Sequence, residues 1–185
     1  MTESETFRGT VSDLGGPTAN LYGCENGHVE ACKNCHRPSC LWPTICPHFS
    51  IDEQAQLDLL RQSRQEPGVK HVFIQSGIRY DLALRDGDAY IDEVARHHVS
   101  GIMKVAPEST DDRVLALMNK PSFDTFRRFK ERFRLATRKA GKKQFITEYL
   151  IAGHPGCDLD TMVSTAATLR AEGMEPDQAQ TFIPQ

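Results

Sequence analysis

Glycine, proline and ionisable residues follow four apolar runs of the sequence, at positions where strands of a parallel sheet would end. These four segments are Asp13-Leu14-Gly15-Gly16-Pro17, Ser76-Gly77-Ile78-Arg79, Pro107-Glu108-Ser109 and Gly153-His154-Pro155-Gly156. Functional groups of parallel α/β proteins gather at the carboxyl ends of the strands, so we expect the four segments to converge. The set therefore predicts a ligand site at one edge of a sheet.

Each residue type at these strand ends has a defined chemistry. The Gly15-Gly16 pair lets the backbone approach a ligand closely. Arg79 supplies a planar donor fork for a carboxylate or a phosphate. Glu108 supplies an acceptor for an ammonium or hydroxyl group, and Lys104 supplies a cation. The alternative is that glycine and proline only turn the chain and that the charges are solvated.

Five of the six cysteines lie close together in the sequence, at Cys24, Cys32, Cys35, Cys40 and Cys46. The spacing of Cys32 and Cys35 lets two sulfurs face one ion, and Cys40 and Cys46 form a second, looser pair. Further candidate ligands are His28, His36 and His48. No secretion signal is present, so metal or redox chemistry is favoured over disulfides. Three interpretations stay open: a structural zinc, an iron–sulfur cluster, or reduced cysteines without a metal.

The stretch from residue 127 to residue 143 carries nine basic residues against the single acidic Glu131. Phe126, Phe129 and Phe133 recur at helical spacing through it, which predicts an amphipathic helix with a buried aromatic face. The basic residues are then either the solvated outer face of that helix or a contact surface for the phosphates of RNA or DNA. We favour the solvated face.

The composition is that of an ordinary soluble protein. The 185 residues include 22 Lys and Arg against 25 Asp and Glu, with a net charge of −3. This balance gives no general attraction to nucleic acids or membranes. No apolar run reaches the roughly 18 residues of a membrane span, and the start lacks a signal peptide pattern. We expect a cytoplasmic protein without membrane contact.

The pattern along the chain alternates strands and helices, which is typical of βα units and a parallel sheet. Strands are expected at residues 9–14, 69–75, 101–106, 145–152 and 178–183. Helices are expected from Ser50, as N-cap, to Pro67, at about 88–98, after residues 109–112, around 126–140 and at about 160–172. Two architectures fit this order, an open doubly wound sheet or a barrel of βα units. A full barrel needs about 250 residues, so the chain is expected to be a piece of a larger protein.

Several segments together resemble the radical S-adenosylmethionine (AdoMet) proteins of the YgiQ type. They are residues 7–20, 37–40, 45–47, 76–81, 104–108 and 152–156, including the Gly15-Gly16-Pro17, Lys104-Val105-Ala106-Pro107-Glu108 and Ala152-Gly153-His154-Pro155-Gly156 motifs. The resemblance covers nearly the whole chain. It implies a partial (βα) barrel spanning residues 1–185, with a cysteine-rich insertion at residues 22–49.

The resemblance also implies a cofactor and its site. AdoMet would lie at the strand ends beside a [4Fe–4S] cluster that cleaves it reductively, with Gly15-Gly16 receiving its methionine amino group. Such proteins usually have Glu after the glycine pair, where this chain has Pro17. The remaining cofactor-binding candidates are Ser76, Arg79, Lys104, Glu108 and His154.

The chain departs from this family in its cluster motif. The C-x-x-x-C-x-x-C pattern that holds the cluster does not occur, so its ligands are expected to lie outside this chain, before Gly15. Cys32, Cys35, Cys40 and Cys46 would then form a separate zinc or iron–sulfur site. We expect an enzyme fragment that is inactive alone. The alternative function is a metal-stabilised RNA-binding module that uses the basic helix at 127–143.

Overall fold

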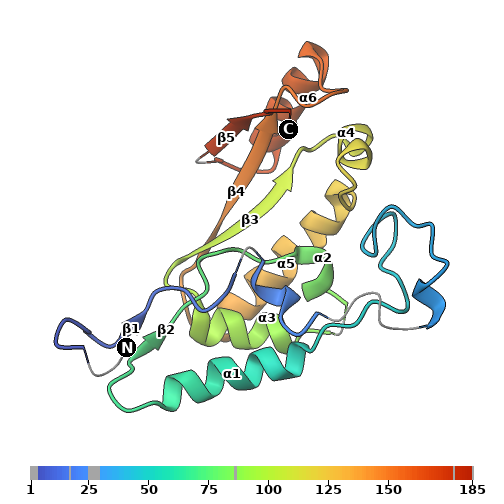
Figure 1. Cartoon of the computed structure of the whole chain (residues 1–185). Helices are drawn as coiled ribbons and strands as arrows, with labels where there is room; N and C mark the ends of the chain where they lie inside the picture. Colours follow the sequence, from blue (N-terminus) through green and yellow to red (C-terminus); the bar gives the residue numbers. More distant parts are fainter. Residues whose placement is uncertain (1–3, 17, 25–29, 86, 177, 185) are drawn as a thin grey trace.

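The computed structural model describes residues 4–16, 18–24, 30–85, 87–176 and 178–184, with the backbone alone at Gln178 (Figure 1). The described residues form a mixed α/β structure with two parallel sheets. In the first, β1 (Thr10–Val11) pairs with β2 (His71–Val72). The second has the order β3 (Ile102–Glu108), β4 (Phe145–Ala152) and β5 (Gln178–Thr181). The prediction of an α/β fold with parallel strands is confirmed.

A continuous barrel sheet does not form among the described residues. The chain after β2 instead lies beside a helix, where the N–H of Ile74 donates to the carbonyl of His98 at 2.9 Å. Three expected strands are shorter than predicted, at residues 9–14, 69–75 and 178–183, although single backbone hydrogen bonds, such as Leu14 N–H to the carbonyl of Phe73, continue beyond the paired residues. The strand at 145–152 is confirmed at both ends, and the strand expected at 101–106 extends to Glu108.

Helices lie between the strands at nearly the expected places. The longer ones are α1 (Glu53–Gln65), α5 (Phe123–Lys139) and α6 (Leu159–Ala171). The shorter ones are α2 (Tyr80–Ala83), α3 (Ala89–Glu93), a π-helical turn (Val94–His98) and α4 (Asp112–Leu117), with 3₁₀ turns at Ala19–Leu21 and Glu30–Cys32.

The N-cap predicted at Ser50 is wrong. Asp52 caps α1, because its Oδ1 accepts a hydrogen bond from the N–H of Ala55 at 2.7 Å. Asp111 caps α4 in the same way, through the N–H of Arg113 at 2.8 Å. In both cases an aspartate next to the helix satisfies a free backbone donor, which a more distant serine does not reach.

The core is organised around α5, as the aromatic spacing predicts. Phe126 and Phe129 are completely buried, and Phe133 is nearly so. They belong to the same apolar cluster as Met103 and Val105 of β3. Burying each phenylalanine side chain contributes about 1.5–3 kcal/mol to stability. The strand ends are therefore held on a rigid support.

The cysteine-rich segment packs into a small cluster of its own. Figure 1 shows residues 30–49 extending away from the sheets, beyond α2. Cys46, Phe49 and Ile51 are buried there against Leu82, a residue of α2. Among the described residues, no helix is both long and apolar enough to cross a membrane.

Candidate functional site

A cavity of about 400 Å³ lies at the carboxyl ends of β2 and β3, and we call it the carboxyl-end cavity. Its volume falls within the range of small-ligand sites, roughly 300–1,000 Å³. The lining residues that matter here come from the loop after β2, from β3 and from the turn after α4: Ser76, Arg79, Tyr80, Asp81, Lys104 and Lys120. Three predicted site residues, Ser76, Arg79 and Lys104, thus share one cavity.

The Gly15-Gly16 pair reaches this cavity through Ser76. Asp13 Oδ1 accepts hydrogen bonds from the N–H of Gln75 at 2.8 Å and from the N–H and Oγ of Ser76 at 3.2 and 3.1 Å. The N–H of Gly16 donates to Ser76 Oγ at 3.3 Å. Hydrogen bonds of the Asp13 and Ser76 side chains therefore connect the carboxyl ends of β1 and β2, in addition to the short β1–β2 ladder.

The two glycines have different roles. A Cβ on Gly15 would lie 2.2 Å from Ser76 Oγ, closer than real atoms approach, so the packing requires glycine at this position. A Cβ on Gly16 would meet no atom within 4 Å, so the Gly16 backbone faces open space. Gly16 is thus the glycine that a ligand could approach. Pro17 lies outside the described residues.

Charged groups of both signs surround the cavity. Arg79 makes a two-point ion pair with Asp81, with Nε to Oδ1 at 3.0 Å and Nη2 to Oδ2 at 2.6 Å. Asn20, which is buried, fixes Arg79 further by accepting from its N–H at 2.7 Å and donating to its carbonyl at 2.8 Å. Neither Asn20 nor Asp81 was predicted as a site residue, although both lie inside the segments that carry the family resemblance.

Glu108 lies at the rim of the cavity and does not line it. Lys120, which does line it, pairs with Glu108 Oε1 at 3.1 Å. Glu108 has a φ of 69°, and the β3–β4 register shifts between Val105 and Glu108. A positive φ costs about 1–3 kcal/mol outside glycine and is concentrated at functional sites. This strained strand end is held in place by the ion pair.

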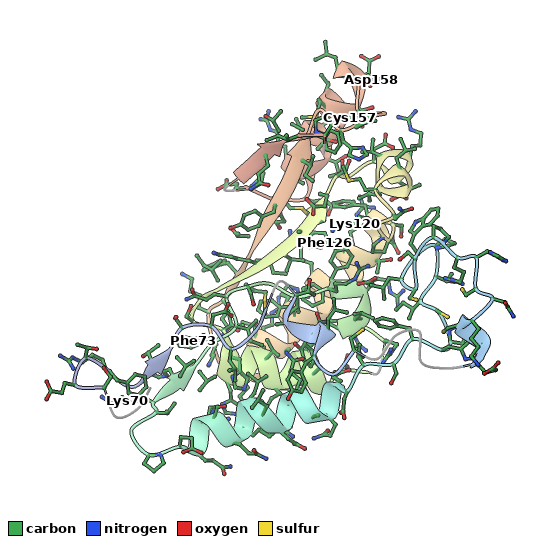
Figure 2. All side chains as sticks on the ribbon, in the orientation of Figure 1. Lys70, Phe73, Lys120, Phe126, Cys157 and Asp158 are labelled. Atoms are coloured by element: carbon green, nitrogen blue, oxygen red, sulfur yellow. The ribbon has the colours of Figure 1, made fainter. Side chains whose placement is uncertain are left out.

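The prediction that His154 belongs to the same site is not supported by its position. His154 does not line the carboxyl-end cavity. Its Nδ1 lies 2.8 Å from the carbonyl oxygen of Pro155, and its ring packs edge-on against Phe182 at 4.7 Å. In Figure 2 the neighbouring Cys157 lies at the far end of β4, well beyond Lys120. The longer β4 carries its terminal loop past the ends of β2 and β3.

Tyr80 presents an unpaired hydroxyl at this site. Its side chain is 4% exposed, and within the described part of the chain its Oη has no hydrogen-bond partner. Burial, and then the neighbouring Asp81 carboxylate, raise the pKa of Tyr80, so the hydroxyl stays protonated. A buried donor without an acceptor costs about 1–3 kcal/mol, and the Tyr80 ring packs against Phe126 and Phe129 of α5.

The predicted metal ligands form two local pairs. The N–H of Cys35 donates to the carbonyl of Cys32 at 3.2 Å, and the N–H of Cys46 to that of Cys40 at 2.7 Å. Desolvation, and then the thiols of Cys46, Cys32 and Cys35, raise the pKa of Cys40, so the two pairs lie near each other. The described residues contain no group of three or more His, Cys, Asp or Glu arranged to hold a metal, and His28 lies outside them.

Most basic residues of α5 have carboxylate partners. The ion pairs are Arg127–Glu172, Lys130–Glu148, Arg132–Asp88, Arg134–Glu131 and Lys139–Asp92. These pairs connect α5 to its surroundings, so the helix face is much less cationic than its sequence indicates. These ion pairs therefore favour the interpretation that the basic residues of α5 form a solvated face of the helix, and not a surface that binds phosphates.

Fold and site together define an α/β protein with parallel strands and a cavity of mixed charge at the strand ends. Over 96–100% of its length the chain is similar to proteins named UPF0313 protein: 46% identical in Vibrio parahaemolyticus, 48% in Geobacter sulfurreducens and 42% in Methanosarcina acetivorans. It is thus homologous to a segment of UPF0313 proteins from bacteria and archaea. It spans about a quarter of their length, 23%, 29% and 25% respectively.

No family model matches the chain, and no solved structure is significantly similar to it. The function is therefore inferred from the residues of the carboxyl-end cavity and its rim.

Proposed function

We propose that this chain carries the AdoMet-binding strand ends of a radical AdoMet enzyme. The observation that supports it most is the convergence of Ser76, Arg79 and Lys104 on one cavity, with Gly15-Gly16 bonded to its edge. The resemblance of these same segments to YgiQ-type radical AdoMet proteins led to the proposal. The cavity brings the segments together independently of that resemblance.

The residues present fit the chemical groups of AdoMet. AdoMet carries a carboxylate, an ammonium, a sulfonium, ribose hydroxyls and an adenine ring, so it needs partners of both charges. Lys104 would pair with the carboxylate, and the open backbone of Gly16 would accept from the ammonium. Arg79, already held by Asp81, would fix the shape of the loop.

The chain does not fit the [4Fe–4S] cluster at this site. No cysteine lines the carboxyl-end cavity, and the C-x-x-x-C-x-x-C motif is missing from the sequence. When bound beside a reduced cluster, AdoMet supplies the 5′-deoxyadenosyl group for radical chemistry. The part proposed for this chain is to bind and orient AdoMet, with the cluster ligands supplied from outside it.

Titration of AdoMet into the purified chain by calorimetry tests this function. We expect saturable binding that Lys104→Ala and Gly16→Ala each weaken roughly tenfold, since each removes or blocks one polar contact to a charged group. Arg128→Ala, on α5 and away from this cavity, is the matched control and should bind like the parent chain. Absence of binding, or equal binding by all variants, would overturn the proposal.

We further propose that Cys32, Cys35, Cys40 and Cys46 hold one zinc ion or one iron–sulfur cluster. The support is the spacing of the two cysteine pairs in the sequence and the thiolate chemistry that both metals share, and the described residues do not yet bring three of these ligands together. Replacing Cys32 and Cys35 together with Ser should remove the metal measured by elemental analysis, whereas Cys157→Ser should not. Equal metal content in both variants would contradict this site.

A further inference from the structure

A second cavity, of about 420 Å³, lies at the opposite edge of the strands. It is formed by residues that precede or begin β2, β3 and β4, together with α1 and the π-helical turn. Its charged and aromatic lining comprises Arg64, Lys70, His71, Phe73, Arg96, His97, Lys142 and Lys143. None of the described residues that line it carries a carboxylate.

The cations in this cavity repel one another. Burial first, and then the charge of Arg64, lower the pKa of both His97 and Lys142. Arg64 has Glu93 at 3.7 Å, but Glu93 also lies 3.5 Å from Arg61 and 3.7 Å from His98. A bound anion would relieve this repulsion, because it would supply the missing opposite charge.

An adjoining cavity of about 570 Å³ shares Lys142, Lys143 and Gln144 with the first, and we call the two together the amino-end groove. It adds Lys130, Arg134 and Arg138. Two carboxylates also line it, Glu148, which pairs with Lys130 at 3.6 Å, and Glu175. The cations extend over both cavities, so their arrangement suits a ligand with several negative charges along its length.

Each cavity also offers an aromatic surface. His71 and Phe73 stack with ring centres 5.5 Å apart and planes 8° from parallel, and His71 is exposed. Phe145 lines the adjoining cavity with 58% of its surface exposed, and Lys143 Nζ lies 5.8 Å from its ring centre. In Figure 2, Lys70 and Phe73 lie near β2, far from Lys120 at the carboxyl end.

We infer that the amino-end groove binds single-stranded nucleic acid. Cations in a groove that follow the backbone, with aromatic rings on which bases stack, are the usual features of such sites. Here the phosphates would lie along Arg64, Arg96, Lys142 and Lys143, and bases would stack on His71 and Phe145. The groove shares Lys130 and Arg134 with the ion-paired residues of α5, but the cations assigned here to the phosphates come from other segments, and their role does not depend on AdoMet binding.

Fluorescence anisotropy with a labelled oligouridylate of about a dozen nucleotides tests this inference, with a DNA oligonucleotide of the same length as a second probe. Replacing Arg96 and Lys142 together with Glu should weaken binding by roughly tenfold or more. The matched control is Arg128→Glu, which changes charge on α5 outside the groove. Because the side chains of Arg96, Lys142 and Arg128 are exposed, we expect each variant to fold, and circular dichroism would check this.

The aromatic residues separate nucleic acid from any other polyanion. His71→Ala with Phe145→Ala should weaken binding of the oligonucleotide about fivefold while leaving the affinity for inorganic polyphosphate unchanged. Equal losses from Arg128→Glu and from the groove variant would overturn the assignment of the groove. Unchanged oligonucleotide binding by the aromatic variant would overturn the assignment of nucleic acid as its ligand.

Discussion

The two ends of the strands differ in how their charges are balanced. At the carboxyl end, Arg79 is paired with Asp81 and Lys120 with Glu108. At the amino end, none of the described residues that line the cavity of about 420 Å³ carries a carboxylate, and burial, followed by the charge of Arg64, lowers the pKa of His97 and of Lys142. A paired arrangement can accept a small zwitterion without large repulsion. A group of cations without neighbouring carboxylates favours a ligand that carries several negative charges.

The ends also differ in rigidity. The carboxyl-end residues are held by Asp13 and Asn20, whose side chains bond to backbone groups of the loop after β2. At the amino end, Arg96, Lys142 and Lys143 are exposed, whereas Arg64 of α1 is half-buried. A preorganised site suits one ligand of fixed shape, whereas flexible lysines and arginines suit a chain that can bind in several registers.

The largest effect is expected from a core substitution that disrupts the ligand sites at both ends of the strands. Phe126 is fully buried, packs edge-on against Tyr80 of the carboxyl-end cavity at 5.6 Å, and shares the core with Met103. Phe126→Ala should lower the free energy of unfolding by about 3–5 kcal/mol. Denaturant unfolding would measure it, with the exposed Leu135→Ala on the same helix as control. Loss of AdoMet binding with full oligonucleotide binding would show that the ends do not share this core.

This core was predictable from the sequence. The spacing of Phe126, Phe129 and Phe133 predicts both the helix and its buried face, because a 3.6-residue period leaves few alternatives. Both ends of the strand at 145–152 were predicted for a similar reason, since a segment rich in β-branched and aromatic residues lies there between polar turns.

The finer features of the two ends were not predictable. Several basic residues of α5 form ion pairs with carboxylates from outside the helix, at Glu172, Asp88 and Asp92. The number of basic residues in the sequence is therefore larger than the number of unpaired positive charges on the helix. The amino-end groove combines residues from position 64 to position 175, and the basic stretch at 127–143 marks only a part of it. Ser76, Arg79 and Lys104 were found because each follows or belongs to a strand.

The next largest effect should come from Gly15 at the carboxyl end. Gly15→Ala places a Cβ against Ser76 Oγ and also within 3.2 Å of Asp13 Oδ1, so it should cost about 1–3 kcal/mol of stability. Gly16→Ala meets no atom and should change the unfolding free energy by less than about 0.5 kcal/mol. Thermal unfolding of the pair measures the difference. Equal losses would mean that Gly15 is not the closely packed glycine.

Salt should separate the two ends without any mutation. If about three phosphates contact the amino-end cations, a fourfold rise in salt should weaken oligonucleotide binding roughly twentyfold, because counterions are released from the strand. AdoMet binding should change little, since its charges are balanced within a partly enclosed cavity. The two titrations over the same salt series provide the measurement, and equal slopes would remove the distinction between the ends.

The smallest effect is that of pH, and it acts through His97. Burial is the main cause that lowers the pKa of His97 below 6.5, followed by Arg64, with Lys142 and Arg96 adding to it and Glu93 opposing it. The unfolded chain then binds the proton more readily than the folded chain. Stability should therefore fall as the pH drops through 6.5 towards the lowered pKa, and His98, whose pKa is also lowered by burial, should add to this loss.

A bound phosphate would reverse the balance at His97. The added negative charge favours imidazolium, so oligonucleotide binding should take up a proton and strengthen a few-fold as the pH falls through the same range. His97→Gln should flatten this dependence while keeping the cations, and AdoMet affinity should not follow it. If oligonucleotide binding by His97→Gln keeps the same pH dependence, the group that takes up the proton is not His97. The pH dependence would then give no support to binding at the amino end of the strands.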